Sequence, residues 1–238
     1  MNNSSREASN WMSLSDMMTG LMIVFLFIAI AFMKQQNNQT KKFKEYADLQ
    51  NELYDDLQRA LKDIQEVEVK PDLSIVISES DFTFKSGQST LESEFKSMLD
   101  NFYSAYLEVL LKEKYRPFIK EVRIEGHTDP ERYKKGESSI PFISNVELSQ
   151  DRARHVLEYL WNTPDFKNVN QKDRKTLEYW FTANGLSYGR MVDKTGRLVY
   201  RIGEAHLKLL PDKTSSRRVE FRIVTNAANL IDEYNKKK

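Results

Sequence analysis

One carboxylate lies near the start of the most apolar stretch of the chain. Asp16 is the only charged residue between positions 11 and 33, and an ionisable side chain at the centre of a membrane-spanning helix costs roughly 2.5 to 3.5 kcal/mol. If this helix starts near residue 11, Ser13, Thr19 and Gly20 share its face with Asp16. Small or hydroxylated neighbours allow a partner helix to approach closely and offer it hydrogen bonds. The pattern indicates that Asp16 can bind and release a proton inside a membrane.

A second interpretation of Asp16 requires no proton chemistry. Asp16 or a nearby serine can cap a helix that begins at Met17, with the carboxylate at the level of the lipid headgroups. That helix would have about 17 apolar residues, which is the short limit for crossing a bilayer. The residues alone leave both interpretations open.

The sequence GHTD places a histidine two residues before a carboxylate, at His127 and Asp129. The two side chains could bind a metal ion or act as a base and its stabiliser. A catalytic metal site commonly has three protein ligands, and the other histidines, His155 and His206, lie in unrelated sequence contexts. We therefore expect neither a metal site nor an enzyme, and we expect His155 to be a packing or solvated residue.

The overall composition excludes several classes of protein. The chain has 36 basic and 35 acidic residues, so it has no excess charge with which to hold nucleic acid. It contains no cysteine, which excludes disulfides and thiolate metal sites. The stretch after residue 70 is long enough to bury one hydrophobic core, so we expect one domain with an N-terminal appendage.

The hydropathy pattern divides the chain into a short tail, a transmembrane helix, a helical linker, a folded domain and a C-terminal tail that we expect to be helical. These parts are residues 1–10, 11–33, 34–70, 71–226 and 227–238. The transmembrane part is expected to be an uncleaved anchor, because it lacks the basic start and the cleavage site of a signal peptide. The linker carries an apolar stripe at helical spacing, formed by Tyr46, Leu49, Leu53, Leu57, Leu61 and Ile64. This stripe either packs on the chain's own domain or pairs with a second copy.

The domain alternates strand patterns and helix patterns. β-branched or alternating runs predict strands at residues 73–78, 120–126, 179–183 and 217–224. Apolar residues at helical spacing predict helices at residues 91–112 and 148–161. Strands separated by helices indicate an α+β fold built as an α/β sandwich, in which a mixed sheet carries helices on one face.

Four stretches of this domain resemble, in order, the signatures of the OmpA-like peptidoglycan-binding domain. They are IEGHTD at 124–129, NVELSQDRARHVLEYL at 145–160, ANGLSYG at 183–189 and RRVEFRIV at 217–224. Together with the N-terminal helix, the long connection at 130–144 is similar to the MotB family of flagellar stators.

Three departures from flagellar MotB resemble instead the MotB-like subunits of Zorya anti-phage defence systems. The basic N-terminal tail is absent, the interval from Trp11 to Asp16 is shorter by one residue, and an insertion occupies residues 190–214. We expect the chain to be of this kind, with a flagellar stator as the alternative.

The resemblance to the OmpA-like domain implies a wall-binding site. Asp129 and Arg152 match the two residues that bind diaminopimelate in the peptidoglycan stem peptide: the carboxylate takes the ligand's ammonium group, and the guanidinium takes its carboxylate. Asn145 and Thr128 match polar contacts beside this pair. Arg152 could instead be a surface charge of its helix, and Arg218 could be a solvated strand residue.

The resemblance to stators implies a proton-driven motor in the bacterial inner membrane. Two copies of the chain would place their helices inside a pentameric MotA-like ring, with a proton at Asp16 as the coupling ion, sodium not excluded, and no other cofactor. The N-terminus would be cytoplasmic and the domain periplasmic, although the lysines between residues 34 and 44 favour the reverse orientation. A passive envelope tether is the alternative from another class.

Overall fold

The computed structural model describes residues 3–78, 83–85, 87–131, 133, 137–200 and 210–226, with the backbone alone at residues 3–16 and Ser78. The chain divides into two compact units, Met1–Asp48 and Leu49–Lys238. The predicted helical tail at residues 227–238 lies outside the described residues, as does His206.

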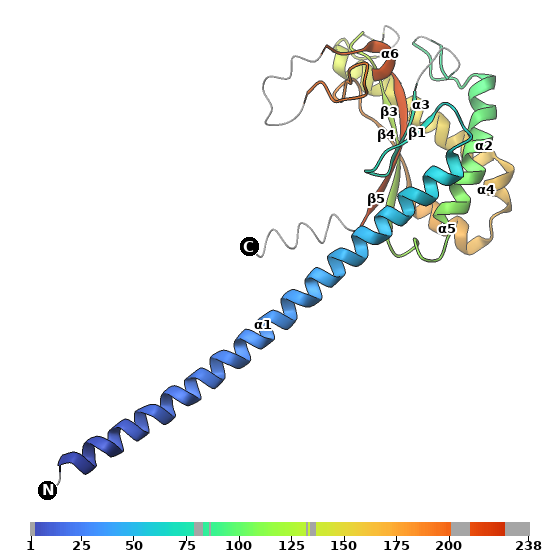
Figure 1. Ribbon diagram of the computed structural model, residues 1–238. Helices are drawn as coiled ribbons and strands as arrows, with labels where there is room; N and C mark the ends of the chain where they lie inside the picture. Colours follow the sequence, from blue (N-terminus) through green and yellow to red (C-terminus); the bar gives the residue numbers. More distant parts are fainter. Residues whose placement is uncertain are drawn as a thin grey trace. The chain divides into compact units, whose positions relative to one another are not determined.

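Helix α1 spans Asn3–Leu61, so it contains the predicted transmembrane segment and most of the predicted linker (Figure 1). Its large apolar side chains between residues 17 and 33 are exposed, with 70% of Met17 and 61% of Phe25 accessible. Within the described part of the chain it is the one helix that is long and apolar enough to cross a membrane. Because the helix begins well before Met17, the interpretation in which Asp16 caps it is wrong.

The end of α1 packs on the core of the second unit. The leucines that are buried there are Leu53, Leu57 and Leu61. Among them, Asp56 accepts hydrogen bonds from Lys112 Nζ at 2.9 Å and from the Tyr115 hydroxyl at 2.8 Å. Burial opposes ionisation of this carboxyl group, but the hydrogen bonds from Lys112 and Tyr115 outweigh burial and hold its pKa well below the usual range. Of the two interpretations of the apolar stripe, packing on the chain's own domain therefore holds for these three leucines.

A five-stranded mixed sheet forms the centre of the second unit. Its strands are β1 Val67–Val69, β2 Ser74–Ser78, β3 Ile119–His127, β4 Phe181–Gly185 and β5 Arg218–Thr225. Their order in space is β1-β2-β5-β3-β4, with β3 and β4 parallel and the other neighbours antiparallel. The sheet therefore begins before residue 71, the predicted start of the domain, because β1 pairs with β2 across a short turn.

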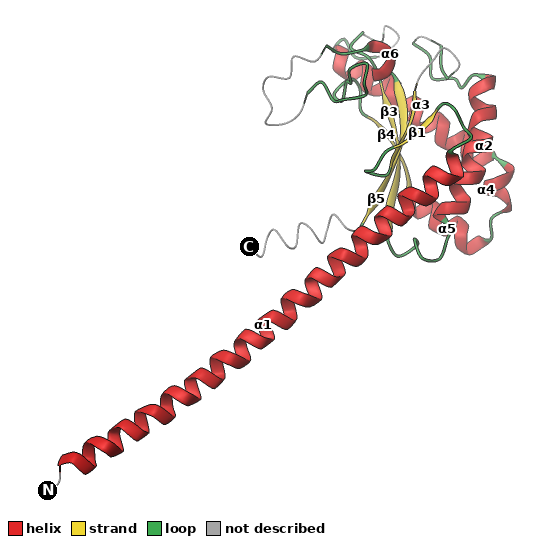
Figure 2. Ribbon diagram, in the orientation of Figure 1, coloured by secondary structure: helices red, strands yellow, loops and turns green. Residues whose placement is uncertain are grey.

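The longer helices of this unit lie together on one face of the sheet (Figure 2). They are α2 Ser93–Leu110, α3 Pro141–Asn162 and α5 Gln171–Trp180, and the short helices are α4 Pro164–Asn168 and α6 Lys213–Ser216. Aromatic rings fill the interface: the ring centres of Phe102 and Tyr106 on α2 lie 4.8 and 5.8 Å from that of Phe221 on β5. The predicted architecture, a mixed sheet with helices on one face, is confirmed.

Two predicted boundaries differ from the structure. Helix α3 begins at Pro141 rather than at residue 148, and proline suits the first turn of a helix because its missing N–H would have no partner there. The strand predicted at 179–183 is Phe181–Gly185, because α5 continues to Trp180.

Candidate functional site

Helix α3 packs very closely on the ends of β3 and β4. A Cβ atom at Gly126 would lie 2.2 Å from the Ser149 carbonyl oxygen, and one at Gly185 would lie 2.4 Å from the Gln150 backbone nitrogen. These distances leave no room for a side chain, so both positions require glycine. The close approach places α3 beside the loop that follows β3.

That loop is tied to the segment that follows β4. The Thr128 N–H donates to the Ser187 carbonyl oxygen at 3.0 Å, and the Ser187 N–H donates to Ser149 Oγ at 3.0 Å. Ser187 is fully buried with φ of 53°, a left-handed conformation that these contacts hold in place. Thr128 Oγ1 is buried without a hydrogen-bond partner among the described residues.

Asp129 and Asn145 meet at the backbone of Glu131. Oδ1 of Asp129 accepts the Glu131 N–H at 2.8 Å, and Asn145 Nδ2 donates to the Glu131 carbonyl oxygen at 2.8 Å. The other carboxylate oxygen of Asp129, Oδ2, lies 3.4 Å from Nη1 of Arg217. Asp129 and Asn145 are 6% and 2% exposed. The structure thus brings Thr128, Asp129 and Asn145 together at one end of the sheet.

Arg152 reaches from α3 to the segment that precedes α2. Its Nε donates to the Gln88 carbonyl oxygen at 2.9 Å, and its guanidinium carbon lies 4.8 Å from the centre of the Phe84 ring. The residue is 2% exposed, so the interpretation of Arg152 as a surface charge is wrong. Because Arg152 and Asn145 both belong to α3, this helix links the Asp129 loop with the segment around Gln88.

His127 belongs to a buried cluster with Glu125 and Glu220, whose ligand atoms all lie within 4.8 Å of one another. That spacing would admit a metal ion, but arginines bind both carboxylates: Arg190 Nη1 lies 3.1 Å from Glu125 Oε2, and Arg218 Nε lies 2.6 Å from Glu220 Oε1. Burial, followed by the charge of Arg218, lowers the pKa of His127 to about 3. The positive charges disfavour a further cation. Arg218 is 5% exposed, so its interpretation as a solvated residue is wrong.

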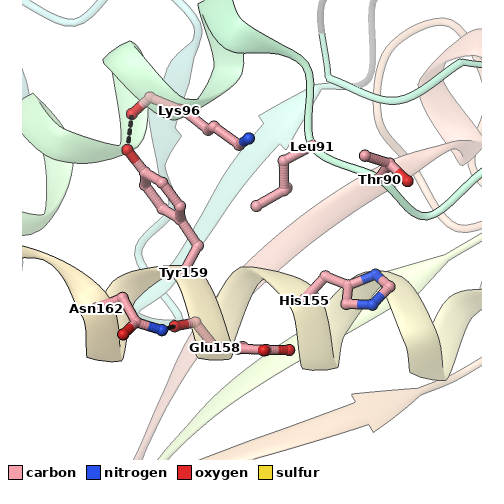
Figure 3. Close-up of a pocket in the computed structure, with 7 residues that line it drawn as sticks. All are labelled: Thr90, Leu91, Lys96, His155, Glu158, Tyr159 and Asn162. Atoms are coloured by element: carbon pink, nitrogen blue, oxygen red, sulfur yellow. Dashed lines mark hydrogen bonds between the residues drawn. The ribbon is translucent and has the colours of Figure 1, made fainter.

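His155 lines a groove between α2 and α3 (Figure 3). The sequence predicts that His155 is a packing or solvated residue. The lining residues are Thr90, Leu91, Lys96, His155, Glu158, Tyr159 and Asn162. Nδ1 of His155 donates to the Ser89 carbonyl oxygen at 2.7 Å, and the Tyr159 hydroxyl donates to Asp100 at 2.9 Å. These bonds hold α2 and the segment before it against α3, so the role of His155 is structural.

The predicted proton site lies on α1. Ser13 and Asp16 are helical residues, and Thr19 and Gly20 are exposed on the same helix. A Cβ atom at Gly20 would meet nothing within 4 Å. The proton site at Asp16 and the contact of this face with a partner helix remain predictions.

Residues that were not predicted also contact Thr128, Asp129 or Arg152: Gln88, Glu131, Ser187 and Arg217. Ser187 and Arg217 lie in stretches on which the resemblance rests, ANGLSYG and RRVEFRIV, and those stretches were the available signal. Gln88 contacts Arg152, and Glu131 contacts Asp129 and Asn145, through backbone atoms, which no residue type reveals.

The fold, together with the loop that carries Thr128 and Asp129, indicates the class of protein. Residues 83–174, within the second unit, match the OmpA family, on a chain whose N-terminal helix is long and apolar enough to cross a membrane. The chain is 35% identical over 235 residues to Zorya protein ZorB of Escherichia coli strain ATCC 8739, which covers 93% of this chain and 90% of that protein. The chain belongs to the ZorB family.

A second relative and a solved structure are more distant. Zorya protein ZorB of Escherichia coli O139:H28 strain E24377A is 21% identical over 223 residues, which covers 90% of this chain and 79% of that protein. A MotB-like protein from Desulfovibrio vulgaris has 16% identity and a TM-score of 0.48, with 77% of this chain and 98% of that chain covered. The predicted resemblance to the Zorya subunits is confirmed.

Proposed function

We propose that the chain is the peptidoglycan-anchored stator subunit of a proton-driven motor complex in the bacterial inner membrane, within Zorya anti-phage defence. One observation carries the proposal: Asp16 lies inside the apolar helix of a ZorB-family chain that also has an OmpA-like domain. A carboxylate inside a membrane helix is costly, and a passive anchor has no use for it. The proposal assigns to Asp16 the coupling proton.

The domain holds the complex to the cell wall through its buried charges. The ammonium group of diaminopimelate pairs with Asp129, and its carboxylate pairs with the guanidinium of Arg152. Thr128 and Asn145 offer hydrogen bonds beside this pair. Asp129 and Arg152 are 6% and 2% exposed, and charges interact more strongly where water is excluded. A ligand that carries both charges satisfies both residues at once.

The motor step follows from the two forms of Asp16. The neutral form tolerates lipid-like surroundings, whereas the charged form requires a polar partner. Two copies inside a pentameric MotA-like ring therefore change their preferred position with each proton bound or released, because protonation shifts the equilibrium between positions. With the domain fixed to the wall in the periplasm and the N-terminus in the cytoplasm, rotation of the ring produces torque. The chain contributes no catalytic residue to this scheme.

Asp16→Asn tests the proposal against a passive tether. Asparagine keeps the size and hydrogen bonding of the acid but cannot ionise, so the complex should assemble and bind peptidoglycan while protection from phage falls to the level of cells without the protein. Asp16→Glu keeps the charge and should retain part of the protection. The measurement is the plating efficiency of phage at matched expression. Full protection with Asp16→Asn would refute the motor and leave the tether.

A further inference from the structure

The insertion that precedes β5 ends in a short helix, α6, which is fixed at both ends. Asp212 Oδ1 accepts the Ser215 N–H at 2.8 Å, which caps the start of the helix. Ser216 at its end is 1% exposed, and its Oγ accepts the Val192 N–H at 3.1 Å. Side chains on α6 and directly after it are therefore presented in a defined direction.

Two cations from this region meet the loop of Asp129. Nη1 of Arg217 lies 3.4 Å from Asp129 Oδ2, and Lys213 Nζ forms a salt bridge with Glu131 Oε1. Nε of Arg217 is shielded from solvent and has no hydrogen-bond partner in the part of the chain that the structure describes. The side chains of Lys213 and Arg217 are 58% and 31% exposed. Both side chains therefore lie beside the loop and are accessible in part to solvent.

A ligand with one ammonium group and one carboxylate does not need these cations. Asp129 accounts for the ammonium group, and Arg152 accounts for the carboxylate. Once the ammonium group occupies Asp129, the guanidinium of Arg217 loses its carboxylate partner while its Nε is still unpaired. A guanidinium that loses its anionic partner is left uncompensated, and a second carboxylate on the ligand would pair with its accessible part, since the side chain is 31% exposed.

We propose that Lys213 and Arg217 form a second anion-binding position, which takes the α-carboxylate of the glutamate next to diaminopimelate in the stem peptide. This inference rests on the proposed wall-binding function of the domain. The γ-linkage of that glutamate leaves its α-carboxylate free, and its place beside diaminopimelate in the peptide brings it to the neighbouring part of the loop. The position makes the protein selective for stem peptides in which this carboxylate is not amidated.

Two synthetic tripeptides, both amidated at the terminal carboxyl group so that diaminopimelate keeps one carboxylate, test the proposal: L-alanyl-γ-D-glutamyl-diaminopimelate and the same peptide with the glutamate α-carboxylate converted to a carboxamide. The full chain in detergent is titrated with each peptide by calorimetry. The wild type should bind the acid about tenfold more tightly than the amide, as expected of one charge-assisted contact. The double variant Lys213→Gln/Arg217→Gln should lose this preference and bind the amide as the wild type does.

The matched control is the double variant Lys172→Gln/Lys175→Gln, which removes two exposed charges from α5 and should keep the preference. Lys213→Gln alone changes a side chain that is 58% exposed, so it leaves the core intact and should reduce the preference. Full preference in the Lys213→Gln/Arg217→Gln variant would refute the second position while wall binding stands. If the wild type binds neither peptide, the proposed wall-binding function fails, and the second position fails with it.

Discussion

The two carboxylate oxygens of Asp129 make hydrogen bonds of unequal strength. Oδ1 accepts the Glu131 N–H at 2.8 Å, whereas Oδ2 lies 3.4 Å from Arg217. The second distance is long for a hydrogen bond between charged groups, so Arg217 compensates the charge of Asp129 only weakly. A ligand ammonium group at a shorter distance would displace it, and the buried carboxylate stays partnered at every stage.

Removing either charge of the proposed wall site should weaken binding to peptidoglycan. Asp129→Ala and Arg152→Ala each remove one charged hydrogen-bonding partner, a loss of about 1.5 to 3 kcal/mol, which is about 10- to 150-fold in affinity. Retention on purified peptidoglycan in a sedimentation assay measures the loss.

Asp151→Ala and Arg154→Ala are the controls for these variants, because they remove an acid and a base that lie half-exposed on the same helix. Both controls should bind as the wild type does. Arg152→Lys separates charge from shape, since lysine keeps the charge but lacks the planar fork, and it should bind weakly. Equal retention of all variants would move the site elsewhere on the domain.

At the scale of elements, periodicity predicts which face of a strand or helix is buried, but not how closely two elements approach. The alternation in RRVEFRIV and the helical spacing at 148–161 correspond to β5 and α3. Neither pattern indicates that Gly126 faces the Ser149 carbonyl oxygen. Strand β1 was missed because its three residues are too few to show a period.

The insertion at 190–214 is the element whose part in the site could not be predicted. Thr128, Asp129 and Asn145 could be grouped because they lie in stretches that resemble one family. Arg217 and Asp129 are 88 positions apart, and they meet because β3 and β5 are antiparallel neighbours in which His127 pairs with Arg218. Arg190 at its start binds buried Glu125, a contact that no local sequence pattern encodes.

Gly126→Ala should destabilise the domain. Its Cβ atom would lie 2.2 Å from a backbone oxygen of α3, so the helix or the strand must shift, at a cost of about 1 to 3 kcal/mol. Gly189→Ala is the control, because the nearest atom to its Cβ would be 3.5 Å away, an ordinary contact. Denaturant unfolding of the full chain in detergent compares the two variants. Equal unfolding midpoints would show that α3 does not lie against Gly126 in this close contact.

At the scale of the whole molecule, the two units place charges in opposite surroundings. The first carries Asp16 on a helix whose neighbouring apolar side chains are exposed, and the second buries Asp129 and Arg152 in a folded domain. The sequence predicts the apolar run around Asp16 from composition and, through the resemblance, a site with Asp129 and Arg152, but it does not predict that these two charges are buried. It does not predict the orientation in the membrane, because the lysines after the helix favour a cytoplasmic domain while a wall-binding domain is useful only in the periplasm.

The orientation is decided by reporters fused to the two ends of the chain. A phosphatase that is active only in the periplasm, fused after Lys238, should be active, because peptidoglycan, the proposed ligand of the domain, lies only there. A fluorescent protein that folds only in the cytoplasm should fluoresce when it is fused before Met1 and stay dark when it is fused after Lys238. Replacing Lys41, Lys42 and Lys44 with glutamine should leave this pattern unchanged, since positive charge near a helix end only biases insertion. Fluorescence from the fusion after Lys238 would place the domain in the cytoplasm, where neither wall binding nor a stator is possible.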